Sequence, residues 1–97
     1  MKTYLEHLAD TIRREAGDSS TDNDLLYLIY AVLLRSSGRS VDASAVHDAW
    51  AAWAIWSGRS GPQAVPWESL TSAEKALDAP FVEAIRRVAA ADSMEMP

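Results

Sequence analysis

NDLLYLIYAVLLRS, residues 23–36, is the stretch that decides the fold of this chain. Its apolar residues follow one another almost without a break, which predicts a helix that is buried on most of its sides. The stretch is shorter than the roughly 20 residues that a membrane-spanning helix needs. We therefore expect the central helix of a globular domain, ended by Gly38.

A second helix is predicted on the N-terminal side, over residues 3–16. Thr3 and Glu6 have the spacing of a capping box, and Gly17 can end the helix in a left-handed conformation. A polar loop, residues 18–22, leads from this helix to the central one. The apolar positions share one helical face: Tyr4, Leu5, Leu8, Ile12 and Ala16.

A third helix is predicted after Gly38. Asp42 or Ser44 can cap its start, and Val41 before the cap suits a hydrophobic staple. The helix should run through the tryptophans to Trp56. The glycines and prolines of residues 57–65 then predict a loop, in which a short β-hairpin is possible.

The last part of the chain is also expected to be helical. Thr71 and Glu74 again have the capping-box spacing and should open a short helical turn. Asp78, with Pro80 just inside, should cap a last helix. We expect this helix to fray into a tail over residues 92–97.

The fold class that follows is all-α: a small bundle of four main helices, with a Gly/Pro loop between the third and the fourth. At 97 residues, with 48% hydrophobic and 24% charged residues, the chain has ordinary proportions for one globular domain over residues 1–97. The N-terminus lacks the apolar stretch of a signal peptide. A cytoplasmic protein without a membrane segment is the expectation.

Charge and cysteine content exclude several function classes. The net charge is −5 and the basic residues are dispersed, which disfavours DNA and RNA as partners. The absence of cysteine excludes disulfides, thiol catalysis and thiolate-bound metals. The acidic loop after Asp18 has Asn23 and Ile29 where a calcium-binding EF-hand needs glycine and glutamate. We predict no metal, no cofactor and no catalytic residue, and thus not an enzyme.

The unusual feature of the sequence is its four tryptophans. Trp50, Trp53 and Trp56 follow at intervals of three and form a slanted stripe on the third helix, with His47 one turn earlier. Two interpretations stay open for these rings. They fill a small core, or a ring at its edge stacks on a planar ligand, an interaction worth about 1–3 kcal/mol for a nucleic-acid base.

Part of the chain resembles the RyR domain, a module repeated in ryanodine receptors. The resemblance covers residues 41–88. It rests on the stretches VHDAW (46–50) and VPWESL (65–70), with Pro62, Glu74-Lys75 and Asp78 at fitting places. The chain also looks like short actinobacterial and actinophage proteins; if phage-encoded, it would act in the host cytoplasm. The loop lacks the second Trp and the Tyr of the RyR pattern, Gly61 stands in place of its His, and Ala79 in place of its Arg.

The resemblance implies a noncatalytic module that binds or sequesters a nucleotide or a nucleotide-derived signal. Trp50 and Trp67 would flank the pocket with Trp53 nearby, His47 would hydrogen-bond the base or ribose, and Arg59 would meet a phosphate. Two other assignments stay open. His47 can instead order the Val65-Pro66-Trp67 segment through a backbone carbonyl. The whole protein can instead be an interaction or assembly subunit that packs its Trp stripe on a protein partner or a second copy.

Overall fold

The computed structural model describes residues 2–19, 23–59, 61 and 64–95, and these residues form helices and connecting turns without a strand. The prediction of an all-α fold with four main helices is confirmed. A one-turn helix and two short 3₁₀ turns complete the described secondary structure. The elements in chain order are α1 (Tyr4–Ala16), α2 (Asp24–Ser37), η1 (Gly38–Ser40), α3 (Ala43–Trp56), η2 (Trp67–Ser69), α4 (Ser72–Ala76) and α5 (Ala79–Glu95).

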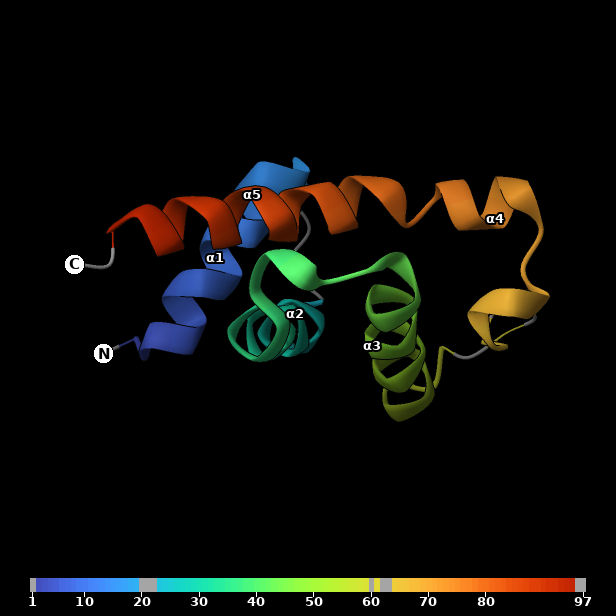
Figure 1. Cartoon of the computed structure of the whole chain (residues 1–97). Helices are drawn as coiled ribbons and strands as arrows, with labels where there is room; N and C mark the ends of the chain where they lie inside the picture. Colours follow the sequence, from blue (N-terminus) through green and yellow to red (C-terminus); the bar gives the residue numbers. More distant parts are fainter. Residues whose placement is uncertain (1, 20–22, 60, 62–63, 96–97) are drawn as a thin grey trace.

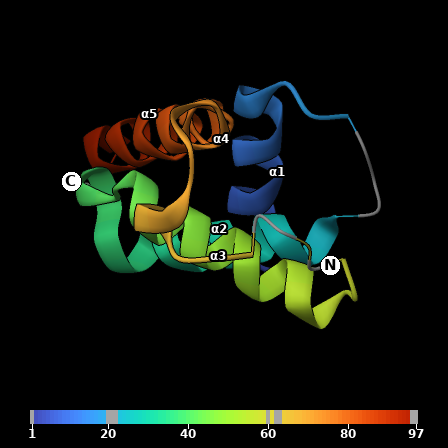
Figure 2. The same cartoon turned by 90° about the vertical axis from the view of Figure 1, so that its right-hand side faces the viewer.

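Helix α2 has the central position that its sequence predicts. It packs against α1, α3 and α5, while α1 also packs against α5. In Figure 1, α4 and α5 follow one another along the upper side of the molecule, above α2 and α3, and α1 crosses behind α5. The quarter turn of Figure 2 shows the segment from η2 to α4 rising from the level of α3 to that of α5. This segment contributes Leu70 and Glu74 to one side of the candidate site.

The local signals at the helix ends are confirmed. Thr3 and Glu6 form a reciprocal capping box, and Thr71 and Glu74 form a second one at the start of α4. Asp42 caps α3, because its carboxylate accepts a hydrogen bond from the Ala45 N–H at 2.8 Å. Gly17 ends α1 with a φ of 72°, which a residue with a side chain rarely adopts.

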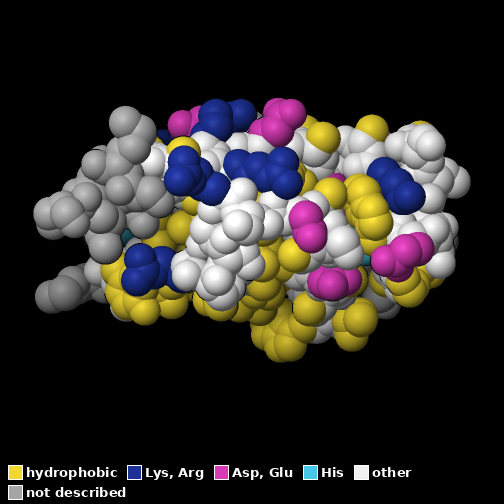
Figure 3. All heavy atoms as spheres, viewed as in Figure 1, with side chains coloured by type: hydrophobic (Ala, Val, Ile, Leu, Met, Phe, Trp, Pro, Cys, Tyr) yellow, Lys and Arg dark blue, Asp and Glu magenta, His cyan; other side chains and the backbone are white. Residues whose placement is uncertain are grey.

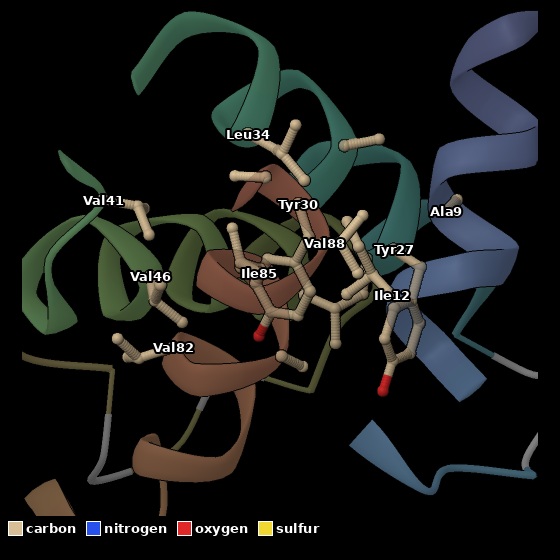
Figure 4. Close-up of a cluster of buried hydrophobic side chains, with 14 of the residues drawn as sticks. Ala9, Ile12, Tyr27, Tyr30, Leu34, Val41, Val46, Val82, Ile85 and Val88 are labelled. Carbon is tan, nitrogen blue, oxygen red and sulfur yellow. The ribbon is translucent and has the colours of Figure 1, made fainter. Parts of the chain in front are cut away.

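The core lies where α2 meets α1, α3 and α5 (Figure 4). The aromatic rings of Tyr27 and Tyr30 meet edge to face, with centroids 5.5 Å apart. Val41 is fully buried, as expected of a hydrophobic staple, and its carbonyl accepts a hydrogen bond of 2.8 Å from Arg86 Nε on α5. The largest fully buried side chains are Ile12, Tyr27, Tyr30, Val41, Val46 and Ile85.

Two expectations differ from the structure or fall outside it, while α2 is buried on most of its sides and exposes the Val32 side chain by 53%. The helical backbone of α5 continues past residue 92 to Glu95, and residues 96–97 lie outside the described part. The described residues of the 57–65 loop hold no strand; residues 60, 62 and 63 lie outside the description, as does part of the polar loop, residues 20–22.

Candidate functional site

A pocket of about 280 Å³ opens between α2, α3 and the segment from residue 70 to residue 81. Its size is close to the lower end of the range usual for small-molecule sites. Aromatic and aliphatic side chains form most of its wall, and carboxylates contribute polar atoms. The lining residues are Asp18, Asn23, Leu26, Tyr30, His47, Trp50, Trp53, Leu70, Glu74, Leu77, Asp78 and Phe81.

Tyr30 is the most buried aromatic residue of the pocket wall, with 1% of its surface exposed. It points from α2 toward α5 (Figure 4), where its ring lies 6.0 Å from that of Phe81. None of the described residues makes a hydrogen bond with its hydroxyl group. Burial, the Asp78 carboxylate and Tyr27 all raise the pKa of the Tyr30 hydroxyl. Tyr30 therefore stays neutral at physiological pH and brings an unpaired O–H to the pocket.

His47 is buried, and its ring is fixed on both nitrogens. Its Nε2 lies 2.6 Å from the Val65 carbonyl oxygen, and its Nδ1 lies 3.4 Å from Asp78 Oδ2. A carbonyl oxygen only accepts hydrogen bonds, so Nε2 must carry a proton and donate it. The ring also stacks on Trp50, with centroids 5.8 Å apart and planes 22° apart. His47 thus joins α3 to the segments that contain Val65 and Asp78.

The Nε2 assignment leaves two proton arrangements for the pair of His47 and Asp78. Either a protonated imidazole faces a carboxylate, or a neutral imidazole accepts a hydrogen bond from a protonated carboxyl group. Burial raises the pKa of Asp78, and the neighbouring His47 works in the opposite direction. Asp78 immediately precedes α5, and its carboxylate faces His47.

The other acidic side chains of the pocket are held in place as well. Asp18 Oδ2 accepts hydrogen bonds from the Tyr27 hydroxyl and from Asn23 Nδ2, both at 2.9 Å. Burial, followed by this bond to Asp18, raises the pKa of Tyr27. Glu74 accepts the Thr71 N–H at 2.9 Å in the capping box of α4. No lysine or arginine is among the described residues that line the pocket.

The structure brings together three of the five site residues that the sequence singles out. His47, Trp50 and Trp53 line the pocket. Trp67 lies on another side of the His47 ring, at 6.2 Å between centroids, and outside the pocket lining. Arg59 is exposed, with its guanidinium carbon 5.1 Å from the Trp53 ring centroid.

The third tryptophan of the sequence lies outside the pocket, and several pocket residues were not identified from the sequence. Trp56 is 74% exposed, so the stripe on α3 does not continue into one buried face. Tyr30, Glu74 and Phe81 line the pocket, yet none of them was expected there. The available signal was the two tyrosines, Tyr27 and Tyr30, inside a helix whose other apolar residues are aliphatic, since a buried tyrosine hydroxyl usually needs a partner.

Metal-binding and membrane-spanning features are not found in the described part of the chain. No group of three or more His, Asp or Glu side chains is arranged to hold a metal ion among these residues. Asp18, the first residue of the acidic loop, is instead a hydrogen-bond acceptor for Tyr27 and Asn23. No described helix combines the length and apolar character that a bilayer span requires.

Comparison with known families corrects the resemblance drawn from the sequence. Residues 3–90 match the model of a family described as "Domain of unknown function (DUF7701)", and no RyR domain family is found. No curated protein and no solved structure matches the chain. The RyR assignment is therefore wrong. The likeness to actinobacterial and actinophage proteins finds no support in these comparisons.

The residues that suggested the RyR domain have a packing role here. Leu70 is 8% exposed, and the Val65 carbonyl is the hydrogen-bond acceptor of His47. A histidine that fixes a Val-Pro-aromatic segment, followed by a buried leucine, is a short packing pattern. Such a pattern can recur without common membership of a family.

Proposed function

Because this chain belongs to the DUF7701 family, whose function is unknown, its function has to be inferred from the site, and we propose that it is a noncatalytic module that binds a small planar ligand. The single observation that carries this proposal is the pocket itself. It combines apolar walls with the unpaired hydroxyl of the buried Tyr30, as small-molecule sites typically combine apolar walls with a few placed polar groups.

The aromatic side chains of α3 suit a flat ligand. Trp50 and Trp53 are one helical turn apart and both line the pocket, so a ring that enters it meets indole surface. The stacking of His47 on Trp50 orients that indole from the core side. A wall that is fixed before binding loses little conformational entropy when a ligand arrives.

A nucleotide remains a prediction, which only the ring surface of the pocket and the position of Arg59 now support, because the RyR resemblance that implied it is wrong. A base would occupy the aromatic pocket. Arg59, which lies over Trp53, would be the candidate partner of a phosphate. The cytoplasmic location remains a prediction too, and it rests on composition.

The state of His47 supports binding without turnover. Its Nε2 donates to the Val65 carbonyl, and its Nδ1 faces Asp78, so neither nitrogen is available as a general base for a ligand. His7, the other histidine of the chain, is exposed on α1 and does not line the pocket. These positions favour a receptor or sequestering protein over an enzyme.

A thermal unfolding screen tests the proposal. Nucleobases, nucleosides, nucleotides and aromatic amines are added singly, each at up to 10 mM (on the order of a hundred times the dissociation constant of a 0.1 mM binder). A ligand at that excess adds about 2.7 kcal/mol, which raises the midpoint by more than about 5 °C. In Trp50→Leu, which removes one indole wall, we expect the shift of a true ligand to disappear.

The matched control is Trp56→Leu. It makes the same change on the same helix, but Trp56 is exposed and outside the pocket. The ligand shift should survive in this variant, each shift being measured against the same variant without ligand. A panel without any shift would contradict the proposal, and a shift lost only in Trp56→Leu would place the ligand elsewhere.

A second candidate function is protein–protein interaction, and one observation favours it. Ile55 and Trp56 are neighbours at the end of α3 and are 65% and 74% exposed. Figure 3 shows hydrophobic side chains gathered on the lower edge of the molecule in the region of α2 and α3. Tryptophan is one of the residue types enriched among interface hot spots.

If the protein partner is a second copy of this chain, the interaction can be measured directly as self-association. Sedimentation velocity over a hundredfold range of concentration should show a dimer that Trp56→Ser abolishes and Trp50→Leu leaves intact. A wild-type protein that stays monomeric at the highest concentration would contradict binding between two copies of this chain.

A further inference from the structure

We propose that the ligand of this pocket is an organic cation, namely a primary amine or amidine attached to an aromatic or apolar body. This inference rests on the proposed function and names the chemical class of the ligand. Three features of the pocket lead to it: its carboxylates, its aromatic faces and the unpaired hydroxyl of Tyr30.

The charged side chains of the pocket wall are acidic. Asp18 and Glu74 come from two different parts of the chain and line the same cavity, and no described lining residue is a lysine or arginine. Asp78 also lines it, but its pair with His47 is neutral overall, so the negative charge comes from the other two carboxylates. These two carboxylates are held in place by hydrogen bonds within the protein. A positively charged ligand would be attracted by this wall, whereas a phosphate would be repelled.

The aromatic side chains of the pocket also favour a positively charged ligand. Trp50, Trp53 and Tyr30 present ring surface to the cavity, and the face of an aromatic ring attracts a cation, most strongly in tryptophan. Two indoles of this chain, one of them in the pocket wall, already lie beside cationic side chains of the chain itself. Arg59 lies over Trp53 at 5.1 Å, and Lys75 Nζ lies over Trp67 at 5.4 Å.

The Tyr30 hydroxyl is an independent indication of a ligand. Its side chain is almost completely buried, it lines the pocket, and no described residue makes a hydrogen bond with it. A hydroxyl group that makes no hydrogen bond within the protein and stands in an otherwise apolar wall can pair with a polar group of a ligand. An ammonium or amidinium group has only donors to offer, and the phenolic oxygen can accept one of them.

Three probes of nearly the same shape separate charge from ring stacking. 2-Phenylethylamine is a cation at pH 7, 2-phenylethanol is neutral and phenylacetate is an anion. Dissociation constants are measured at low ionic strength from chemical-shift titrations of the Trp50 indole N–H. We expect the amine to bind at least tenfold more tightly than the alcohol, and the anion to bind more weakly than the alcohol.

Two variants assign the preference to the pocket. Glu74→Gln removes one charge, while its amide oxygen can still accept the Thr71 N–H of the capping box; it should weaken amine binding about fivefold and leave the alcohol unchanged. Tyr30→Phe should also weaken amine binding, without loss of fold. The matched control is Glu68→Gln, an exposed position in η2 outside the pocket, which should leave all three constants unchanged.

The outcomes distinguish this inference from the proposed function. If amine and alcohol bind equally well, or if only adenosine or its phosphates bind in a manner that requires Trp50, the cation inference is overturned and the binding module stands. If neither these probes nor the wider panel binds at 10 mM, both are overturned. An amine preference that Glu68→Gln removes as strongly as Glu74→Gln does would reflect the net charge of the protein and would also overturn the inference.

Discussion

Replacing His47 with alanine is expected to destabilise the protein by about 3–5 kcal/mol, because it leaves two buried polar groups without their partner and a space in the packing. The substitution leaves the Val65 carbonyl without its 2.6 Å donor and the buried Asp78 carboxylate without its neighbour. It also leaves a space beside the Trp50 ring, which adds a packing cost. Urea unfolding followed by far-UV circular dichroism measures the loss as a lower midpoint.

The matched control is His7→Ala. His7 is the other histidine of the chain and is exposed on α1, so its replacement should change stability by less than about 0.5 kcal/mol. His47→Ala leaves the Asp78 carboxylate without its partner, and Asp78→Asn removes that carboxylate. The loss of stability in the double variant should therefore be smaller than the sum of the losses in the two single variants. If His47→Ala lowered the free energy of unfolding by less than about 1 kcal/mol, His47 would not be what joins α3 to the segments that contain Val65 and Asp78.

The pH dependence of this loss follows from the direction of the Asp78 pKa. Burial raises that pKa above its ordinary value of 3.8, and His47 lowers it, so removing His47 should raise it further. A group whose pKa is higher in the folded state than in the unfolded state loses its contribution to stability as the pH rises through that interval. The penalty of His47→Ala should therefore be smaller near pH 4 than at pH 7, and carbon-detected NMR of the Asp78 carboxyl group reports the pKa directly.

The parts of the fold that the sequence predicts well are those decided by neighbours in the chain. The capping boxes at Thr3 and Thr71 need only a partner three residues away, and both form. The apolar run of α2 predicts its central place, because so much aliphatic surface must be covered from several sides. The exposure of Val32 could not be predicted in the same way, since it depends on which of those sides the other helices cover.

The candidate site could be predicted only in the part that α3 contributes. His47, Trp50 and Trp53 recur at intervals of three on one helix, so helical geometry alone brings them to the same wall. Tyr30 and Asp78 reach that wall from α2 and from the start of α5, and only tertiary packing decides this. The alternative assignment of His47, as a residue that orders the Val65 segment through a carbonyl, is confirmed by the 2.6 Å contact.

Residues in the loops were the hardest to place from sequence. Arg59 and Trp67 lie at the two ends of the connection between α3 and η2, whose path is not set by helical periodicity. Trp67 follows the Val65 carbonyl that His47 holds, so the histidine fixes its position beside the imidazole instead of in the pocket. The short RyR-like pattern could not replace this information, because the same residues serve packing here.

Truncating Trp53 is expected to cost about as much stability as removing His47. The Trp53 side chain is 7% exposed and belongs to the hydrophobic core as well as to the pocket wall. Replacing a buried tryptophan by alanine typically costs 3–5 kcal/mol, because the lost apolar contacts leave a cavity that neighbours fill only in part. Domains of this size are commonly stable by about 5–15 kcal/mol, so Trp53→Ala should unfold at a much lower urea concentration and with a similar slope.

Two further variants make the Trp53 result interpretable. Trp53→Phe keeps an apolar ring and should lose less than half as much, so it gives a measurable value even if Trp53→Ala does not fold. Trp56→Ala, one turn further along α3 at a 74% exposed position, should stay within about 0.5 kcal/mol of the wild type. Equal losses at Trp53 and Trp56 would contradict the division of the stripe into one buried and one exposed ring. A large loss at Trp53 alone means that the ring which walls the pocket also holds the core, so any ligand that binds there should raise the stability of the whole fold.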